Sequence, residues 1–263
     1  MRNISTLIIL LATVFTLGSH GILAQETAQV EFDKANILME KGDYYNALKA
    51  YHLIEAQGFR SSFLYLNMGI SAAQIDSLGL AKYYFLKTIK HFPNDTEAKV
   101  EAERALLFVN SQFSRQSATL PKLPWDKALD WLKEVPTAYG VFWFGYLMGI
   151  IACLLLAGKW FSIITFKKLN QVTVIFAISA VLIVTLAYYV SYIEMRFNDA
   201  VVINTETKVL QQPTETGTTE SFAFEGYTLT IDYKLSKENP DWYYVRLSNG
   251  QLGWIKKTEV KPL

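Results

Sequence analysis

The sequence predicts a multidomain membrane protein in which an all-α domain, two transmembrane helices and a small all-β barrel follow one another along the chain. Three observations predict this class. Residues 28–110 show the apolar periodicity of packed helices, two long stretches in the middle are apolar and uncharged, and the stretch after Asp199 alternates like strands. The 25 basic and 24 acidic residues nearly balance, so overall charge does not indicate a nucleic-acid partner.

Residues 1–24 have the layout of a secretory signal peptide. Arg2 precedes a short apolar run at 7–17, and Ala24 offers a small residue for cleavage. The alternative is an uncleaved anchor, but the run is shorter than the roughly 20 residues that cross a bilayer. The pattern therefore predicts export of the domain that follows.

Residues 137–158 and 171–193 are predicted to be transmembrane helices, because each is long enough to span a bilayer and contains no charged residue. Buried core helices are the alternative, and aromatic residues near both ends, such as Tyr139 and Trp160, favour the membrane. The connecting loop, 159–170, contains three lysines and no acidic residue. Since such loops stay in the cytoplasm, both soluble domains are expected on the opposite side.

The exported region, residues 25–110, contains an internal repeat. Residues 42–54 align with 76–89 at a period of about 34 residues. In each copy an alanine, Ala47 or Ala81, allows close helix packing, and an aromatic residue follows four positions later. With Pro93 ending the second copy, the pattern resembles the tetratricopeptide repeat, and residues 96–110 resemble its capping helix.

The resemblance implies a groove, lined by the first helix of each repeat, that binds a partner protein. Phe32 stands where repeats that clamp a terminal carboxylate carry lysine, so an apolar groove for a helix or extended segment is expected. The alternative for each position is a place in the core. The groove positions are Phe32, Asn36, Met39, Phe63, Leu66, Asn67, Ile70 and Arg104.

Residues 111–136 form a linker whose second half is amphipathic. From Trp125 onward, Ala128, Leu129 and Leu132 fall on one helical face. A helix in this position, directly before a span, is expected to lie in the membrane interface.

Residues 199–263 are predicted to form about five short strands in a small barrel. Asn249 and Gly250 predict a two-residue type I′ turn, and the strand face that contains Val245 is expected in the core. The spacing of Trp242, Val245, the turn and Trp254 resembles the bacterial SH3-like domain.

That resemblance implies binding of peptides, cell-wall fragments or a neighbouring domain. The candidate surface aromatics are Trp242, Tyr244 and Trp254. The alternative is that these side chains pack the barrel.

No motif of a hydrolase, nucleotide-binding protein or zinc protease occurs, and the expectation is a protein that is not an enzyme. Three histidines and one cysteine show no metal-ligand spacing, so neither a metal nor another cofactor is expected.

The order of domains resembles the E components of the Bacteroidota aerotolerance (Bat) operons. This resemblance implies an inner-membrane scaffold with two periplasmic interaction domains, acting in stress tolerance beside von Willebrand factor A domain proteins and a MoxR-type ATPase. An alternative is a cell-wall sensor or anchor that binds peptidoglycan through the SH3-like domain. A third is a non-catalytic subunit of a membrane enzyme or secretion complex.

Overall fold

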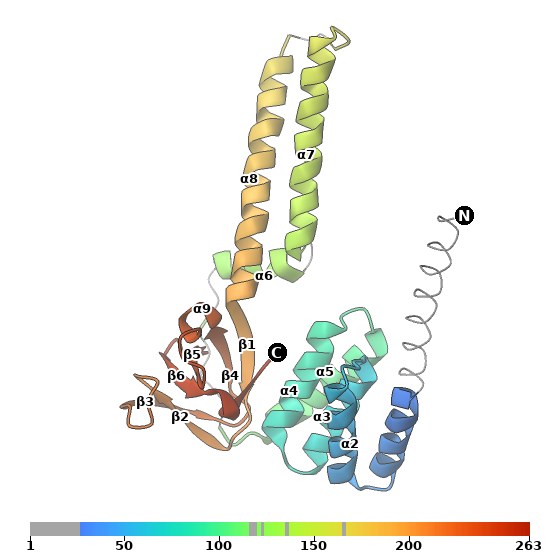
Figure 1. The fold of residues 1–263 in the computed structure, drawn as a ribbon, viewed down its shortest axis with the longest axis vertical. Coiled ribbons are helices and arrows are strands. Elements are labelled where there is room, and N and C mark those ends of the chain that lie inside the picture. Colours follow the sequence, from blue (N-terminus) through green and yellow to red (C-terminus); the bar gives the residue numbers. More distant parts are fainter. Residues whose placement is uncertain (1–26, 116–119, 122–123, 135–136, 165–166) are drawn as a thin grey trace, which may run out of the picture.

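The computed structural model describes residues 27–115, 120–121, 124–134, 137–164 and 167–263. It contains a helical domain, two long antiparallel apolar helices and a separate antiparallel β domain (Figure 1). The coarse class expected from the sequence is therefore confirmed. The expected signal peptide, residues 1–24, lies outside the described residues.

The helical domain consists of consecutive antiparallel helices. Side chains cap three of them: Asp43 accepts from the Asn46 amide, Ser61 from the Leu64 amide and Asp95 from the Ala98 amide. The helices are residues 27–40, α2 (Tyr44–Ala56), α3 (Ser62–Gln74), α4 (Leu78–His91) and α5 (Thr96–Gln112).

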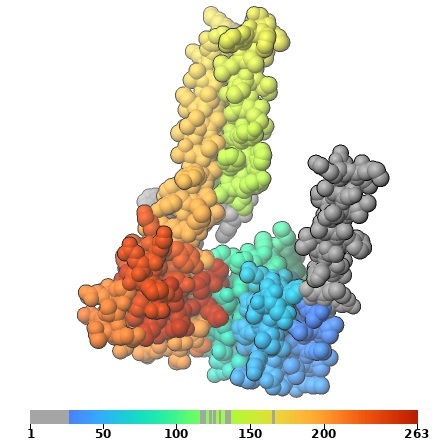
Figure 2. Space-filling model, viewed as in Figure 1, coloured from blue at the N-terminus to red at the C-terminus, as the bar shows by residue number. Residues whose placement is uncertain are grey.

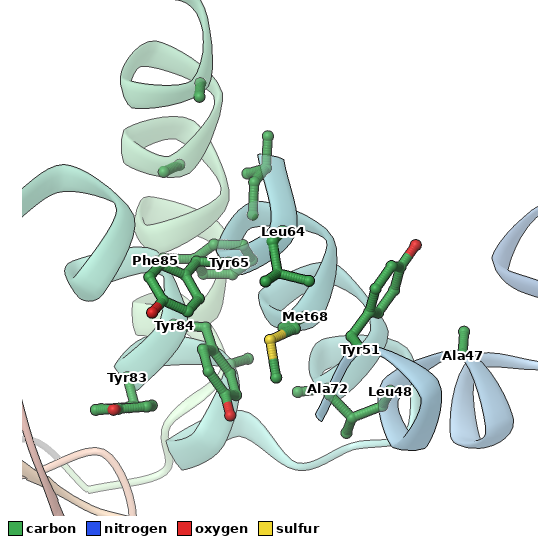
Figure 3. Close-up of a cluster of buried hydrophobic side chains, with 14 of the residues drawn as sticks. Ala47, Leu48, Tyr51, Leu64, Tyr65, Met68, Ala72, Tyr83, Tyr84 and Phe85 are labelled. Atoms are coloured by element: carbon green, nitrogen blue, oxygen red, sulfur yellow. The ribbon is translucent and has the colours of Figure 1, made fainter. Parts of the chain in front are cut away.

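Small residues bring these helices together around an aromatic core (Figure 3). Ala47, Ala81 and their aromatic neighbours Tyr51 and Phe85 are fully buried, as the repeat pattern predicts. Phe85 lies directly against Gly69, where an added Cβ would be 2.5 Å from the Phe85 ring. The glycine is therefore required for the approach of α3 and α4.

Helices α7 (Thr137–Trp160) and α8 (Leu169–Arg196) form a hairpin, and both are long and apolar enough to span a bilayer. They pack closely through small residues: a Cβ at Gly145 would lie 2.9 Å from Val184. The shorter α6 (Pro124–Glu134) contacts both near the soluble domains (Figure 1). The helix expected in the linker is thus present, although the Trp125 side chain lies outside the described part.

The β domain is one antiparallel sheet in the order β3-β2-β6-β5-β4-β1-β7. Its first strand follows α8 without a linker, so the domain begins at Phe197 and not at Asp199. The elements are β1 (Phe197–Val202), β2 (Glu206–Leu210), β3 (Thr219–Phe224), β4 (Thr228–Asp232), α9 (Tyr233–Ser236), β5 (Trp242–Leu247), β6 (Leu252–Lys256), the 3-10 helix η1 (Lys257–Glu259) and β7 (Val260–Pro262).

The Val245 face of β5 is buried in the core of the sheet with Leu247, as expected. The type I′ turn was a wrong prediction. The Leu247 amide donates to the Gln251 carbonyl, and Gly250 has a positive φ of 88° whereas Asn249 does not. Residues 248–250 therefore form a three-residue loop, with glycine at the left-handed position.

The helical and β domains are in direct contact through α4 and β1 (Figure 2). Among the described residues, the Ser77 side chain does not cap α4, and the Gly79 amide instead donates to Glu225 Oε1 at 2.7 Å. Along β1, Val202 faces the sheet core while Val201 joins the buried cluster of the helical domain. The β domain thus supplies the cap of a helix in the other domain.

Candidate interaction sites

Two asparagines on neighbouring first helices meet at one tyrosine. Tyr51 of α2 donates its hydroxyl to Asn36 Oδ1 at 2.6 Å, and Asn67 Nδ2 donates to the same oxygen at 3.0 Å. Burial is the main cause that raises the pKa of Tyr51 to about 12; the hydrogen bond from Asn67 acts in the opposite direction and nearby Glu40 adds to the increase. The hydroxyl therefore remains a donor throughout the physiological pH range.

This arrangement leaves hydrogen-bonding capacity on both carboxamides. Within the described part of the chain, neither Asn36 Nδ2 nor Asn67 Oδ1 has a protein partner. One is a donor and the other an acceptor, which is the combination that pairs with a peptide group. Phe63, one helical turn before Asn67, is 41% exposed and offers an apolar contact beside them.

Four other residues predicted to line the groove differ in their exposure. Phe32, Met39 and Ile70 are half-buried against the core, and the Phe32 ring lies 5.7 Å from that of Tyr51. Arg104 is exposed on α5 and pairs with Glu101 at 2.7 Å.

Leu66 was wrongly predicted to line the groove. It is only 5% exposed and belongs to the same buried cluster as Ala98 and Ala102 of α5. Helix α5 packs on α3, and the repeat alignment alone does not show which positions of α3 it covers.

Helix α5 has an exposed apolar face that was not predicted from the sequence. Leu107 and Phe108 are 73% and 63% exposed, and Val100 lies partly exposed on the same helix. The signal was available in "ALLFV", since a helix cannot turn that many consecutive apolar residues toward one core. The helix predicted to cap the repeats therefore has an apolar outer face.

A second feature missed by the sequence analysis is a charged cluster between α2 and α4. Lys87 Nζ lies 2.6 Å from Glu55 Oε1 and 4.2 Å from the centre of the Tyr65 ring. Burial alone would raise the pKa of Glu55, but interactions with His52 and Lys87 outweigh it and lower the pKa to about 2. Glu55, Lys87 and Tyr65 lie on three different helices and are joined through Lys87, so the cluster stabilises the packing of α2, α3 and α4.

On the β domain, Tyr244 and Trp254 form a half-exposed aromatic pair on the outer face. They are cross-strand neighbours, and their rings meet edge to face with centres 5.2 Å apart. Leu252 extends the pair and is largely exposed.

Trp242 was wrongly predicted to be a surface residue, since it is only 8% exposed. Lys256 lies over its ring at 5.8 Å and is held there by Glu215 at 2.7 Å. The loop that contains Glu215 is far from Trp242 in sequence, which is why the strand pattern did not reveal this cover.

Within the described ranges, no group of three or more His, Cys, Asp or Glu side chains is placed to hold a metal ion. Comparison with protein-family models and with curated proteins finds no match to this chain.

Proposed function

We propose that the protein is an inner-membrane scaffold that presents two periplasmic protein-interaction domains and has no catalytic activity of its own. The observation that carries this proposal is the convergence of Asn36 and Asn67 beside the exposed Phe63. Two carboxamides with free donor and acceptor groups bind a peptide backbone in register, and the phenyl ring adds an apolar contact for a side chain. We also infer a tetratricopeptide-like architecture for the helical domain, from the period of about 34 residues and the burial of Ala47 and Ala81.

The membrane location is supported by the hairpin. Both helices turn large apolar side chains outward, including Phe142, Leu154 and Leu182, which a bilayer would cover. The helical and β domains lie at the same end of this hairpin (Figure 1), and the loop with Lys167 and Lys168 lies at the other. Under the rule that basic loops remain in the cytoplasm, both domains are periplasmic.

The partners we propose are membrane proteins of an aerotolerance or stress-related complex, with von Willebrand factor A domain proteins and a MoxR-type ATPase among them. This assignment rests on the order of domains and on the small SH3-like barrel that we infer for the β domain. Tethering two interaction domains to one bilayer raises their effective concentration for a partner in the same membrane.

Co-purification from native membranes tests the proposal. Phe63→Glu places a charge at the exposed end of the groove, and Leu53→Glu is the matched control, because Leu53 is 59% exposed on α2. We expect the control and the wild type to retain the same membrane proteins and Phe63→Glu to lose them. If all three proteins retain the same partners while their circular dichroism spectra agree, the groove is not the binding site.

A second candidate function is a peptidoglycan sensor or anchor, favoured by the Tyr244–Trp254 pair. Exposed aromatic rings stack on sugar faces, and Leu252 enlarges the surface. The full-length protein in detergent would then sediment with purified peptidoglycan, and Trp254→Ala would weaken this while leaving groove-dependent partners in place. Sedimentation that does not depend on Trp254 argues against this candidate.

A further inference from the structure

We propose that helix α9 lies in the lipid headgroup layer, with the Leu235 side chain in contact with lipid and with Lys234 and Lys237 bound to lipid phosphate. This inference rests on the proposed membrane-spanning hairpin and adds a second membrane contact, made by the β domain.

The end of the hairpin next to the β domain marks the edge of the bilayer. The uncharged stretch of α8 ends at Ile193. At 1.5 Å per residue, Arg196 lies about 4.5 Å beyond that edge along the helix. Exposed aromatic residues of the type that favours the interface occur at the same end of both helices. They are Tyr139 and Trp143 on α7 and Tyr188, Tyr189 and Tyr192 on α8.

Arg196 holds α9 close to this edge of the bilayer. Its Nη2 donates to Asp232 Oδ2 at 2.6 Å, and Nε donates to both carboxylate oxygens. Asp232 is in turn the N-cap of α9 and accepts from the amides of Lys234 and Leu235 at 3.0 and 3.2 Å. Because each polar headgroup layer is about 5 Å or more thick, a helix that begins beside Arg196 lies within it.

The exposed residues of α9 suit that environment. Leu235 is 46% exposed although its helix is held by hydrogen bonds at both ends, and Lys234 before it and Lys237, the C-cap of α9, are exposed as well. Lysines beside an apolar residue extend their ammonium groups to phosphate while the leucine contacts the acyl boundary. Two exposed acidic residues, Glu194 and Glu238, lie close in sequence to Arg196 and Lys237, so the segment has no large net charge and the expected ligand is the phosphate common to zwitterionic and anionic lipids.

A second set of hydrogen bonds holds α9 within the β domain. Ser236 Oγ donates to the Asp232 carbonyl at 2.7 Å and accepts from the Tyr244 amide at 2.8 Å. Helix α9 is on the side of the sheet that faces the hairpin, whereas β3 is at the far side (Figure 1). An exposed apolar residue on β3, Phe222, therefore serves as a control position away from the bilayer.

Fluorescence quenching in liposomes tests the inference with the full-length protein. Cys153 is the only cysteine of the chain. A bimane label is attached to Leu235→Cys, Lys237→Cys or Phe222→Cys in a Cys153→Ala background. Phosphatidylcholine with a nitroxide on its headgroup is the quencher. We expect the labels at positions 235 and 237 to lose most of their fluorescence and the label at 222 to keep its own. Adding Lys234→Glu to Leu235→Cys should reduce the quenching, because the carboxylate repels phosphate.

The same method tests separately whether the hairpin spans the bilayer and whether α9 contacts it. Cys153 lies within the uncharged stretch of α7, nearer the loop between the two helices, with its side chain exposed. In the otherwise unchanged protein, a label at this residue should be quenched by an acyl-chain nitroxide. If it is quenched while position 235 behaves like 222, the inference about α9 is wrong and the hairpin stands. If Cys153 is not quenched, the hairpin does not span the bilayer and both proposals fall.

Discussion

Arg196, the last residue of α8, holds the carboxylate of Asp232 with both Nε and Nη2, at 3.1 and 2.6 Å from Oδ2. The pair joins the long apolar helix to the β domain. Burial alone would raise the pKa of Asp232, but hydrogen bonds from Arg196 and from the amides of Leu235 and Lys234 outweigh it and lower the pKa. The carboxylate is therefore charged at all physiological pH values, and its contribution to stability decreases only when the pH falls below the ordinary carboxyl range.

Arg196→Lys is expected to loosen this joint although the charge is kept. A lysine cannot make the forked contact that the guanidinium makes with the carboxylate, so fewer hydrogen bonds would hold Asp232. Hydrogen exchange at the amides of Lys234 and Leu235 should become faster. Arg104→Lys is the control, because its pair with Glu101 is largely exposed and contributes little. Unchanged exchange in α9 would show that the joint does not depend on the fork.

The helical domain should lose stability in acid through Glu55. Its folded-state pKa of about 2 lies below the ordinary value of 4.5, so its contribution is fully present above pH 4.5 and is lost as the pH falls toward 2. We expect Glu55→Gln to cost on the order of 2 kcal/mol at neutral pH and to flatten the pH dependence in this window. Urea unfolding followed by near-ultraviolet circular dichroism measures both. A wild-type profile that does not change between pH 4.5 and 2 would contradict the argument.

Gly79→Ala is expected to separate the helical and β domains. A Cβ there would lie 2.7 Å from the Val202 carbonyl oxygen, a backbone atom that cannot move without shifting β1. Overpacking of this kind costs about 1–3 kcal/mol. Hydrogen exchange should rise in α4 and β1 and stay unchanged in α3. Gly149→Ala is the control, since its Cβ would be 3.8 Å from Ala180, an ordinary contact.

Asn249 and Gly250, in the loop between β5 and β6, should respond differently to alanine. Gly250 has φ of 88°, a conformation in which other residues lose about 1 kcal/mol, and a Cβ there would lie 2.8 Å from Leu120. Asn249 does not have a positive φ, and its side chain makes two exposed hydrogen bonds with Gln251: Oδ1 accepts from the amide at 3.1 Å and Nδ2 donates to Oε1 at 2.8 Å. Thermal unfolding should therefore show a larger loss for Gly250→Ala than for Asn249→Ala. Equal losses would favour the type I′ turn.

Features that depend on neighbouring residues could be predicted from the sequence. The two apolar helices follow from uncharged runs, and the burial of Ala81 and Phe85 follows from a spacing of one helical turn. The face of β5 that contains Val245 follows from the two-residue period of a strand.

Features that depend on distant residues could not be predicted. Glu225 caps α4 across 146 positions of sequence, and Arg196 meets Asp232 across 36. Asp232 stands inside an alternating stretch that continues to Leu235, so the pattern predicts a longer strand, and its role as the N-cap of α9 ends β4 earlier. Leu66 and Trp242 were predicted to be exposed, but in the folded chain neighbouring side chains bury them.

The most direct test of the scaffold is photo-crosslinking in living cells. A benzophenone amino acid replaces Phe63, in the proposed groove, or Leu53, on α2. Both side chains are exposed. We expect a discrete protein adduct on irradiation at position 63 and none at 53, and the adduct should be lost when Asn67 is changed to Ala. Equal adducts at both positions, or none at 63 while the protein is folded and in the membrane, would contradict a partner-binding groove.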